Sequence, residues 1–182
     1  MRRLADEMGI GVMTLYGYAA SKEEIVEGAA LVAIRDIHED PGSDATWDER
    51  VRAAVHDLHE VTRQHPNLVA IVLAQRTPAP GLFRTREQIL RALHDGGFDD
   101  ARALRAMGIL TSYVLGFSSA QGAALFASVE LIRELPSDEF EHLTRSADLY
   151  PEHVSDEAFE YGLDLLLDGL RRELKRIRGA LK

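Results

Sequence analysis

The stretch LADEMGIGVMTLYGYAASK, residues 4–22, decides how this chain is expected to fold. Apolar residues recur about one helical turn apart on two short segments of it, and Gly9 lies at the break between them, where helices commonly end in a left-handed residue. Ser21 is followed three positions later by Glu24, the capping-box arrangement that opens a further helix. The stretch therefore predicts a helix-turn-helix, a motif whose second helix can enter the major groove of DNA.

The composition is that of an ordinary globular protein. The chain has 182 residues, of which 46% are hydrophobic and 28% charged, enough to form a sizeable core together with a small appended module. No apolar run approaches the roughly 18 residues that span a bilayer, and the start of the chain lacks the apolar core of a signal peptide. The absence of cysteine excludes disulfides, thiol catalysis and cysteine-bound zinc. We therefore expect a cytoplasmic protein with no membrane partner.

Charge is distributed unevenly along the chain. The net charge of −9 argues against a general nucleic-acid binder, because the affinity of such proteins comes from neutralising phosphates. The N-terminal stretch is the exception, since its basic residues outnumber its acidic ones: Arg2, Arg3 and Lys22 against Asp6 and Glu7. An acidic body with a less acidic head suits a protein that contacts DNA at one tip only.

The rest of the chain is also predicted to be helical, and no segment has the period of a strand. Turn-forming residues and prolines mark the breaks at 40–44, 77–81 and 96–97 and at Pro136 and Pro151. Between them we expect helices over about 21–38, 46–64, 68–76, 82–95, 99–120, 137–145 and 156–178. Thr46 or Asp48 can cap the second of these helices, and Asp99 or Asp100 opens the long one. The fold class is therefore all-α.

Several of these helices have predicted apolar faces. The helix over 82–95 is expected to bury Phe83, Ile89, Leu90 and Leu93. The helix over 99–120 has an inward row of Leu104, Met107, Leu110 with Thr111, Val114, and Phe117 with Ser118. The last helix carries a broad apolar arc of Phe159, Gly162, Leu163, Leu166, Leu167 and Leu170. That width is typical of a helix that also forms a subunit interface; the alternative is a helix that is simply central to its own bundle.

The N-terminal stretch resembles the DNA-binding signature of the TetR-type (tetracycline-repressor-like) transcriptional regulators. In that family a leucine-alanine helix, a glycine turn, a Thr-Leu-Tyr recognition helix and a Ser-Lys helix start follow one another, as they do here at Leu4-Ala5, Gly9, Thr14-Leu15-Tyr16 and Ser21-Lys22. The resemblance implies an all-α protein with its helix-turn-helix region at residues 1–38 and a helical-bundle domain for ligand binding and dimerisation at residues 39–182. Family members normally begin with one further helix, so we expect the helix-turn-helix in this sequence to be incomplete.

For function, the resemblance implies a ligand-responsive regulator, a repressor that a small molecule releases from operator DNA. It further implies a homodimer formed through the helices near 100–120 and 156–175. The expected DNA-contact residues are Gly11, Val12, Met13, Thr14, Tyr16, Tyr18 and Lys22. Hydroxyl and ammonium groups in this set suit phosphates, and Val12 and Met13 suit thymine methyl groups.

Two departures from the family pattern keep a second class of protein open. Gly17 occupies a recognition-helix position where the family usually has a larger side chain, and glycine costs about 1 kcal/mol of helix propensity relative to alanine. Ala19 stands in place of the usual bulky apolar residue. The alternative is a helical ligand-binding or protein-interaction module that does not bind DNA.

In the family, inducers bind inside the larger helical domain. The corresponding candidates are Val55, His59, Leu73, Phe83, Leu90, Met107, Thr111 and Tyr113, any of which can instead be plain core. Such a set has the composition of a small-molecule site and implies a largely apolar ligand.

No catalytic or cofactor-binding pattern accompanies these residues. The chain has no Gly-x-Ser-x-Gly turn, phosphate loop or dinucleotide glycine pattern, so we predict neither an enzyme nor a cofactor. His56 and His59 are one helical turn apart, a spacing that permits shared metal ligation with His94 as a third ligand. Such spacing is also common among surface histidines, and we predict no metal.

Overall fold

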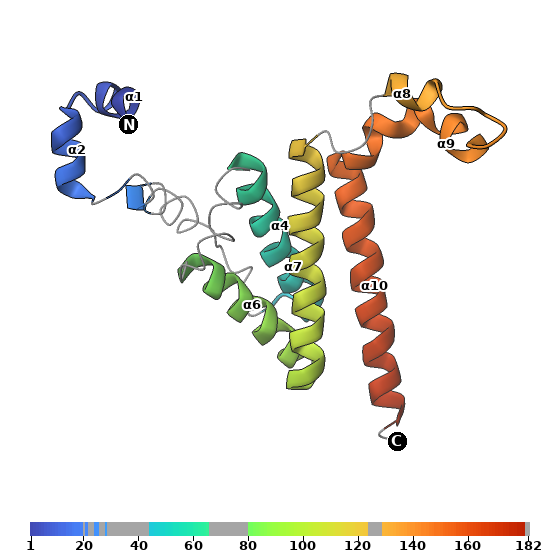
Figure 1. Cartoon of the computed structure of the whole chain (residues 1–182). Helices are drawn as coiled ribbons and strands as arrows, with labels where there is room; N and C mark the ends of the chain where they lie inside the picture. Colours follow the sequence, from blue (N-terminus) through green and yellow to red (C-terminus); the bar gives the residue numbers. More distant parts are fainter. Residues whose placement is uncertain are drawn as a thin grey trace.

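The computed structural model describes residues 1–19, 21, 24, 25, 28, 44–65, 80–123 and 129–180 (Figure 1). All the regular elements within these residues are helices, which confirms the predicted all-α class. The helix predicted over 68–76, most of the helix predicted over 21–38, and the candidate residues Lys22 and Leu73 lie outside the described residues. None of the described helices is both long enough and apolar enough to cross a membrane.

The N-terminal stretch forms the predicted pair of short helices, α1 (Arg2–Glu7) and α2 (Val12–Tyr18). Gly9 adopts the expected left-handed conformation with φ of 65°, and Gly11 caps α2 in an extended conformation. Ala5 and Leu15 are the buried residues that join the two helices. In Figure 1 this pair stands apart from the other labelled helices.

The body of the molecule is built on four longer helices. They are α4 (Trp47–Gln64), α6 (Pro80–Gly96), α7 (Asp100–Ala123) and α10 (Asp156–Ala180). In Figure 1, α7 runs between α4 and α6 on one side and α10 on the other. The largest fully buried apolar side chains come from all four helices: Val51, Val55, Ile89, Leu93, Leu110, Val114, Phe159, Leu163 and Leu167. One hydrophobic core therefore holds the body together.

Side-chain caps explain where three of these helices begin. Of the two candidates for α4, Thr46 is the cap: its backbone N–H donates to the Glu49 carboxylate at 2.8 Å, closing a capping box. Asp99 accepts a hydrogen bond from the backbone N–H of Arg102 at 2.8 Å and so caps α7. Ser155 caps α10 through the backbone N–H of Ala158 at 3.2 Å.

Two predicted apolar faces need correction. Phe83 is exposed on α6, whereas Ile89 and Leu93 are fully buried as expected. On α7, Leu104 is 58% exposed while its neighbours Ala103 and Ala106 are buried. The inward row of α7 therefore begins on small side chains, because alanine lets the helices approach closely where a leucine would not fit.

Helix boundaries differ from the prediction in two places. Helix α6 begins at Pro80, inside the predicted breaker, because proline is well suited to the first turn of a helix, where its missing N–H leaves no bond unmade. The helix predicted over 137–145 begins only at Glu141, as α9 (Glu141–Arg145), because a turn on the Pro136 carbonyl precedes it. It is flanked by α8 (Val129–Arg133) and the 3₁₀ helix η1 (Ala147–Val154), which runs across the predicted stop at Pro151. In Figure 1, α8 and α9 project from one end of the body.

The broad arc of α10 belongs mainly to its own bundle. Phe159, Leu163 and Leu167 are fully buried, and Leu166 and Leu170 pack against the core from its edge. The arc therefore gives no independent support for a subunit interface. Other apolar residues of α10 remain exposed, as do some of α7: Tyr161, Leu165, Leu104 and Ile109.

Candidate functional site

The first candidate site is the open surface of α2. Leu15 is buried against α1, whereas Met13 and Tyr18 are 84% and 82% exposed. Gly11, Thr14 and Tyr16 are also exposed, and Val12 is half-buried. All the described residues of the predicted DNA-contact set except Val12 are thus exposed on α2 or at its N-cap, while Lys22 lies outside the described residues.

The second candidate site is a buried aromatic cluster where α4, α7 and α10 meet. The rings of His59 and Phe159 stack with centroids 3.7 Å apart and planes 10° apart. Tyr113 and Phe117, both on α7, each lie 5.3 Å from the Phe159 ring. Phe159 therefore connects His59 to Tyr113, the two members of the predicted ligand set that share a cluster.

A chain of hydrogen bonds runs through this cluster. The Thr62 hydroxyl donates to the His59 carbonyl at 2.7 Å and lies 2.5 Å from the Ser118 hydroxyl. The Ser118 hydroxyl lies in turn 3.5 Å from Nδ1 of His59. His59 is only 6% exposed, and its Nε2 has no hydrogen-bond partner among the described residues. Burial lowers the pKa of His59, against the opposing influence of the Asp156 carboxylate, so the imidazole is held neutral.

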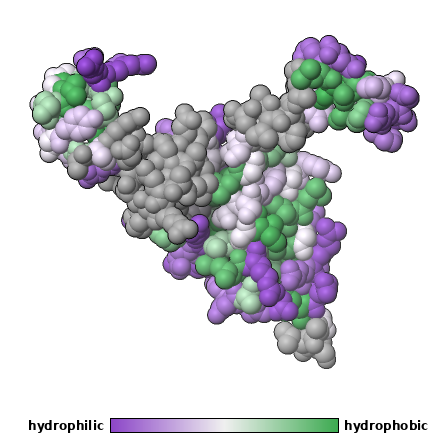
Figure 2. All heavy atoms as spheres, viewed as in Figure 1, coloured by the Kyte–Doolittle hydropathy of each residue, from purple (hydrophilic) through white to green (hydrophobic). Residues whose placement is uncertain are grey.

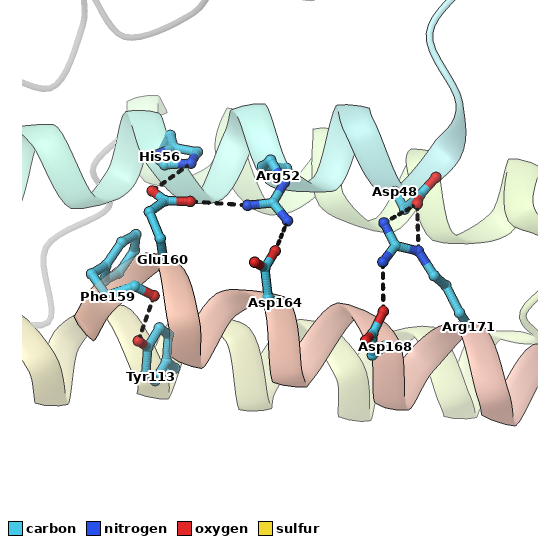
Figure 3. Close-up of polar contacts among 9 residues, drawn as sticks. All are labelled: Asp48, Arg52, His56, Tyr113, Phe159, Glu160, Asp164, Asp168 and Arg171. Carbon is cyan, nitrogen blue, oxygen red and sulfur yellow. Dashed lines mark hydrogen bonds and ion pairs between the residues drawn. The ribbon is translucent and has the colours of Figure 1, made fainter. Parts of the chain in front are cut away.

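Tyr113 ties α7 to α10 at a point of close approach. Its hydroxyl donates to the Phe159 carbonyl at 2.8 Å, as Figure 3 shows. A Cβ atom on Gly162 would lie only 2.7 Å from the Tyr113 Cζ, so this position of α10 requires glycine. Burial also raises the pKa of the Tyr113 hydroxyl, with the Glu160 carboxylate adding to the effect, which keeps that hydroxyl protonated as a donor.

Ion pairs join α4 to α10 along the rim of the cluster (Figure 3). Arg52 pairs with Glu160 at 3.0 Å and with Asp164, and His56 Nε2 lies 3.0 Å from the second Glu160 oxygen. Further along, Arg171 donates to Asp48 at 2.7 Å and also pairs with Asp168. Burial works to raise the pKa of the Asp48 carboxyl, but hydrogen bonds from Thr46 and Arg171 outweigh it and lower that pKa.

The other described residues of the predicted ligand set have different surroundings. Val55 is fully buried core, and Leu90 and Met107 pack at the edge of that core. The Thr111 hydroxyl bonds to carbonyls of its own helix, those of Met107 and Gly108. Within the described residues, a shallow hollow opens instead at the start of α7, lined by His94, Phe98, Asp99, Asp100, Ala101, Arg102 and Arg105. It contains none of the predicted ligand residues.

The three histidines considered for a metal have separate partners. His56 pairs with Glu160, His59 lies against Ser118, and His94 Nδ1 lies 3.0 Å from the Phe98 carbonyl. No group of three metal-ligating side chains lies together in the part of the chain that the structure describes.

Sequence reasoning missed four members of the buried cluster: Thr62, Ser118, Phe117 and Phe159. Phe117, Ser118 and Phe159 had been assigned only to inward faces or arcs of their helices, Thr62 or its neighbour Val61 likewise, and none of the four to a functional site. The helical row of α7 did point Ser118 inward. Nothing in the spacing links it to Thr62 or His59, which come 56 and 59 positions earlier in the chain.

Together, these elements define an all-α protein with a helix-turn-helix head and a helical body. A family model described as "Tetracyclin repressor-like, C-terminal domain" matches residues 40–174. The chain therefore belongs to the tetracycline-repressor-like (TetR) family of transcriptional regulators.

Individual relatives agree with this assignment. An HTH-type transcriptional regulator of Saccharopolyspora erythraea is 26% identical over 121 residues, 66% of this chain and 51% of the relative, so the chain spans about half of that protein. The tetracycline repressor protein class A from transposon 1721 of Escherichia coli is 24% identical over 180 residues, 97% of this chain and 83% of the relative.

Solved structures share the fold. A possible TetR family transcriptional regulator from Streptomyces coelicolor A3(2) superposes with a TM-score of 0.77 and 27% identity, covering 94% of this chain and 88% of that one. The Streptomyces coelicolor TetR family protein ActR, in complex with actinorhodin, gives a TM-score of 0.69 at 22% identity, covering 96% of this chain and 87% of that one.

Proposed function

We propose that this protein is a homodimeric, ligand-responsive DNA-binding regulator, a repressor that a small molecule releases from its operator. The observation that carries this proposal is the surface of α2, which buries Leu15 and exposes Met13, Thr14, Tyr16 and Tyr18. In this reading residues 1–38 form the DNA-binding region and residues 39–182 the ligand-binding and dimerisation domain.

The DNA contact of the proposed head combines two kinds of side chain. Thr14, Tyr16 and Tyr18 offer hydroxyls to phosphates, and the exposed Met13 offers an apolar surface to thymine methyl groups. The net charge of −9 limits favourable contact with DNA to this head.

The proposed ligand site is the bundle, with His59 and Tyr113 as its polar groups. Both residues meet at Phe159, so an apolar molecule with a polar substituent would find rings and a hydrogen-bonding group together. The ActR complex with actinorhodin offers a precedent for a small molecule in a protein of this fold.

Release from the operator needs two states of the dimer. A ligand shifts their populations only as far as its affinity for one state exceeds its affinity for the other. The proposed dimer places two α2 helices about 34–36 Å apart, one turn of DNA, and the ligand favours a state with a different separation.

Fluorescence anisotropy of the natural full-length protein tests the repressor function, using labelled fragments of the DNA upstream of its own gene. We expect tight binding to one fragment and a steep loss of affinity as salt rises, because binding releases counterions. Thr14→Ala should weaken binding, whereas Thr144→Ala on α9, which also deletes a single hydroxyl, should not. The absence of binding to every fragment at low salt would refute the repressor function.

A second candidate is a ligand-binding module that does not contact DNA. Gly17 favours it, since this exposed position of α2 offers DNA no side chain, and within the described part of the chain no atom beyond its own helix lies within 4 Å to exclude one. Such a protein would still dimerise and bind small molecules while showing no salt-sensitive DNA complex.

A further inference from the structure

The hydrogen bonds around His59 have a direction that fixes where the protons lie. The only hydroxyl proton of Thr62 is donated to the His59 carbonyl, at 2.7 Å. In the 2.5 Å contact between Thr62 and Ser118, Thr62 is therefore the acceptor and Ser118 the donor.

The same reasoning reaches the imidazole ring. Because Ser118 has given its only proton to Thr62, it can only accept from Nδ1 of His59, 3.5 Å away. Nδ1 therefore carries the hydrogen. A neutral imidazole has one N–H, so Nε2 is left with a bare lone pair, and this atom is buried without a hydrogen-bond partner among the described residues.

We infer that the ligand of the bundle is an aromatic or otherwise apolar molecule that donates a hydrogen bond, from a hydroxyl or N–H group, to Nε2 of His59. In naming this chemistry we rely on the proposed function, which makes the bundle a ligand-binding unit. Carboxylate ligands are rejected at this atom, because they have no proton to donate and present a negative charge to the lone pair.

The surroundings of His59 favour such a molecule over a bound water. A buried water usually makes about three hydrogen bonds, and Nε2 is the only unpaired buried side-chain atom of the cluster in the described part of the chain. The adjoining side chains are rings: Phe159 stacks on the imidazole and Phe117 lies edge-on at 5.9 Å. An aromatic molecule with one hydrogen-bond donor can pack against these rings and also donate to the lone pair on Nε2 of His59.

Two matched probes test the inference in the absence of DNA. They are 1-naphthol, which has a hydroxyl donor, and 1-methoxynaphthalene, which has the same ring system but no donor. Calorimetric titration of the full chain should show about tenfold tighter binding of 1-naphthol, the effect of one buried hydrogen bond. His59→Phe keeps a ring against Phe159 but removes the acceptor, so the preference should vanish. His56→Phe is the matched control, because the His56 ring also lies near Phe159, with centroids 5.9 Å apart. This substitution should leave the preference for 1-naphthol intact.

The tautomer provides a readout that does not depend on any ligand. Nitrogen-15 NMR of the His59 ring should show hydrogen on Nδ1 and none on Nε2. In Thr62→Val, Ser118 loses its acceptor and its proton becomes available to Nδ1, so the hydrogen should move to Nε2 and the 1-naphthol preference should fall towards equality.

Several outcomes overturn the inference: hydrogen on Nε2 in the unaltered protein, equal affinity for the two probes, no binding of either, or a preference that survives His59→Phe. Failure of the proposed function looks different. A protein that prefers 1-naphthol through His59 yet binds no promoter fragment is not a repressor, while the ligand chemistry stands.

Discussion

Gly162 shows how one residue sets the distance between two helices. Glycine is a poor helix former, yet it lies in the middle of α10, at the point where the Tyr113 ring crosses from α7. The ring can then place its hydroxyl 2.8 Å from the Phe159 carbonyl. Close approach, rather than flexibility, accounts for glycine here.

Substitution of Gly162 by alanine should destabilise the protein by about 1–3 kcal/mol, the usual cost of overpacking, even though alanine is the better helix former by about 1 kcal/mol. Urea unfolding measures the difference. The cost should be smaller in a Tyr113→Phe background, because the hydroxyl that meets the new methyl group is gone. An equal cost in both backgrounds would show that the Tyr113 hydroxyl is not the obstacle.

His59 should make stability depend on pH in a defined direction. Burial lowers its pKa in the folded protein, so the unfolded chain binds the proton more readily. The stability of the fold should therefore be complete above the unfolded pKa of about 6.5 and decline as the pH falls below it towards the folded pKa. Urea unfolding between pH 8 and pH 5 tests this, and His59→Phe should lack this part of the decline. If the stability of His59→Phe declines by the same amount, groups other than His59 cause the decline.

The tautomer of His59 lay beyond prediction from sequence. Thr62 and Ser118 are ordinary residues on two helical faces, and their contact spans 56 positions of the chain. Spacing placed His59 one turn from His56, which permits shared metal ligation and is equally common among surface histidines. In the fold, His56 lies at the rim beside Glu160 and His59 is buried. Periodicity identifies a face, but the partner across the interface comes from tertiary packing.

At the scale of elements, ion pairs rather than hydrophobic contacts form the rim between α4 and α10. Arg52 reaches both Glu160 and Asp164, and all three side chains remain partly exposed. Partly exposed pairs contribute little each, because water and salt screen them. They serve mainly to align the two helices over the buried cluster.

Arg52→Gln should therefore lower the free energy of unfolding by only about 0.2–1 kcal/mol, and the loss should shrink in 1 M salt, where charges are screened within about 3 Å. Arg91→Gln is the matched control, since the ion pair of Arg91 with Glu87 lies within α6 and is long, at 3.7 Å. A large loss that salt leaves unchanged would instead assign Arg52 a packing role.

Elements with strong local signals were predicted well. The turn at Gly9, a cap at Thr46 and the helices α7 and α10 are fixed by residues close together in sequence. The prediction of which α7 residues are buried was partly wrong. Hydrophobicity favours burial of Leu104 over Ala103, whereas packing against neighbouring helices favours burial of the smaller side chain. Local propensity predicts the helix, but not the closeness of its neighbours.

At the scale of the whole molecule, α7 and α10 form a surface that the rest of the described chain does not cover. Tyr161 and Leu165 of α10 are more than half exposed, as is Ile109 of α7. Figure 2 shows hydrophobic residues among hydrophilic ones over this part of the body. Apolar side chains on two adjoining long helices suit the helix packing of a symmetric dimer, in which each residue is used twice.

Leu165→Glu should convert the proposed dimer into monomers, because two-fold symmetry places two new carboxylates in one apolar interface. Light scattering at micromolar concentration measures the mass, and Phe83→Glu on α6, an exposed apolar residue outside α7 and α10, is the control that should leave the dimer intact. DNA affinity should fall together with dimerisation, since a monomer presents one α2 helix where the proposed operator has two half-sites. A monomeric mass for the unaltered protein would refute the dimer. A monomeric Leu165→Glu that retained full operator affinity would show that a single head is sufficient, and would remove the two-half-site geometry from the proposed mechanism.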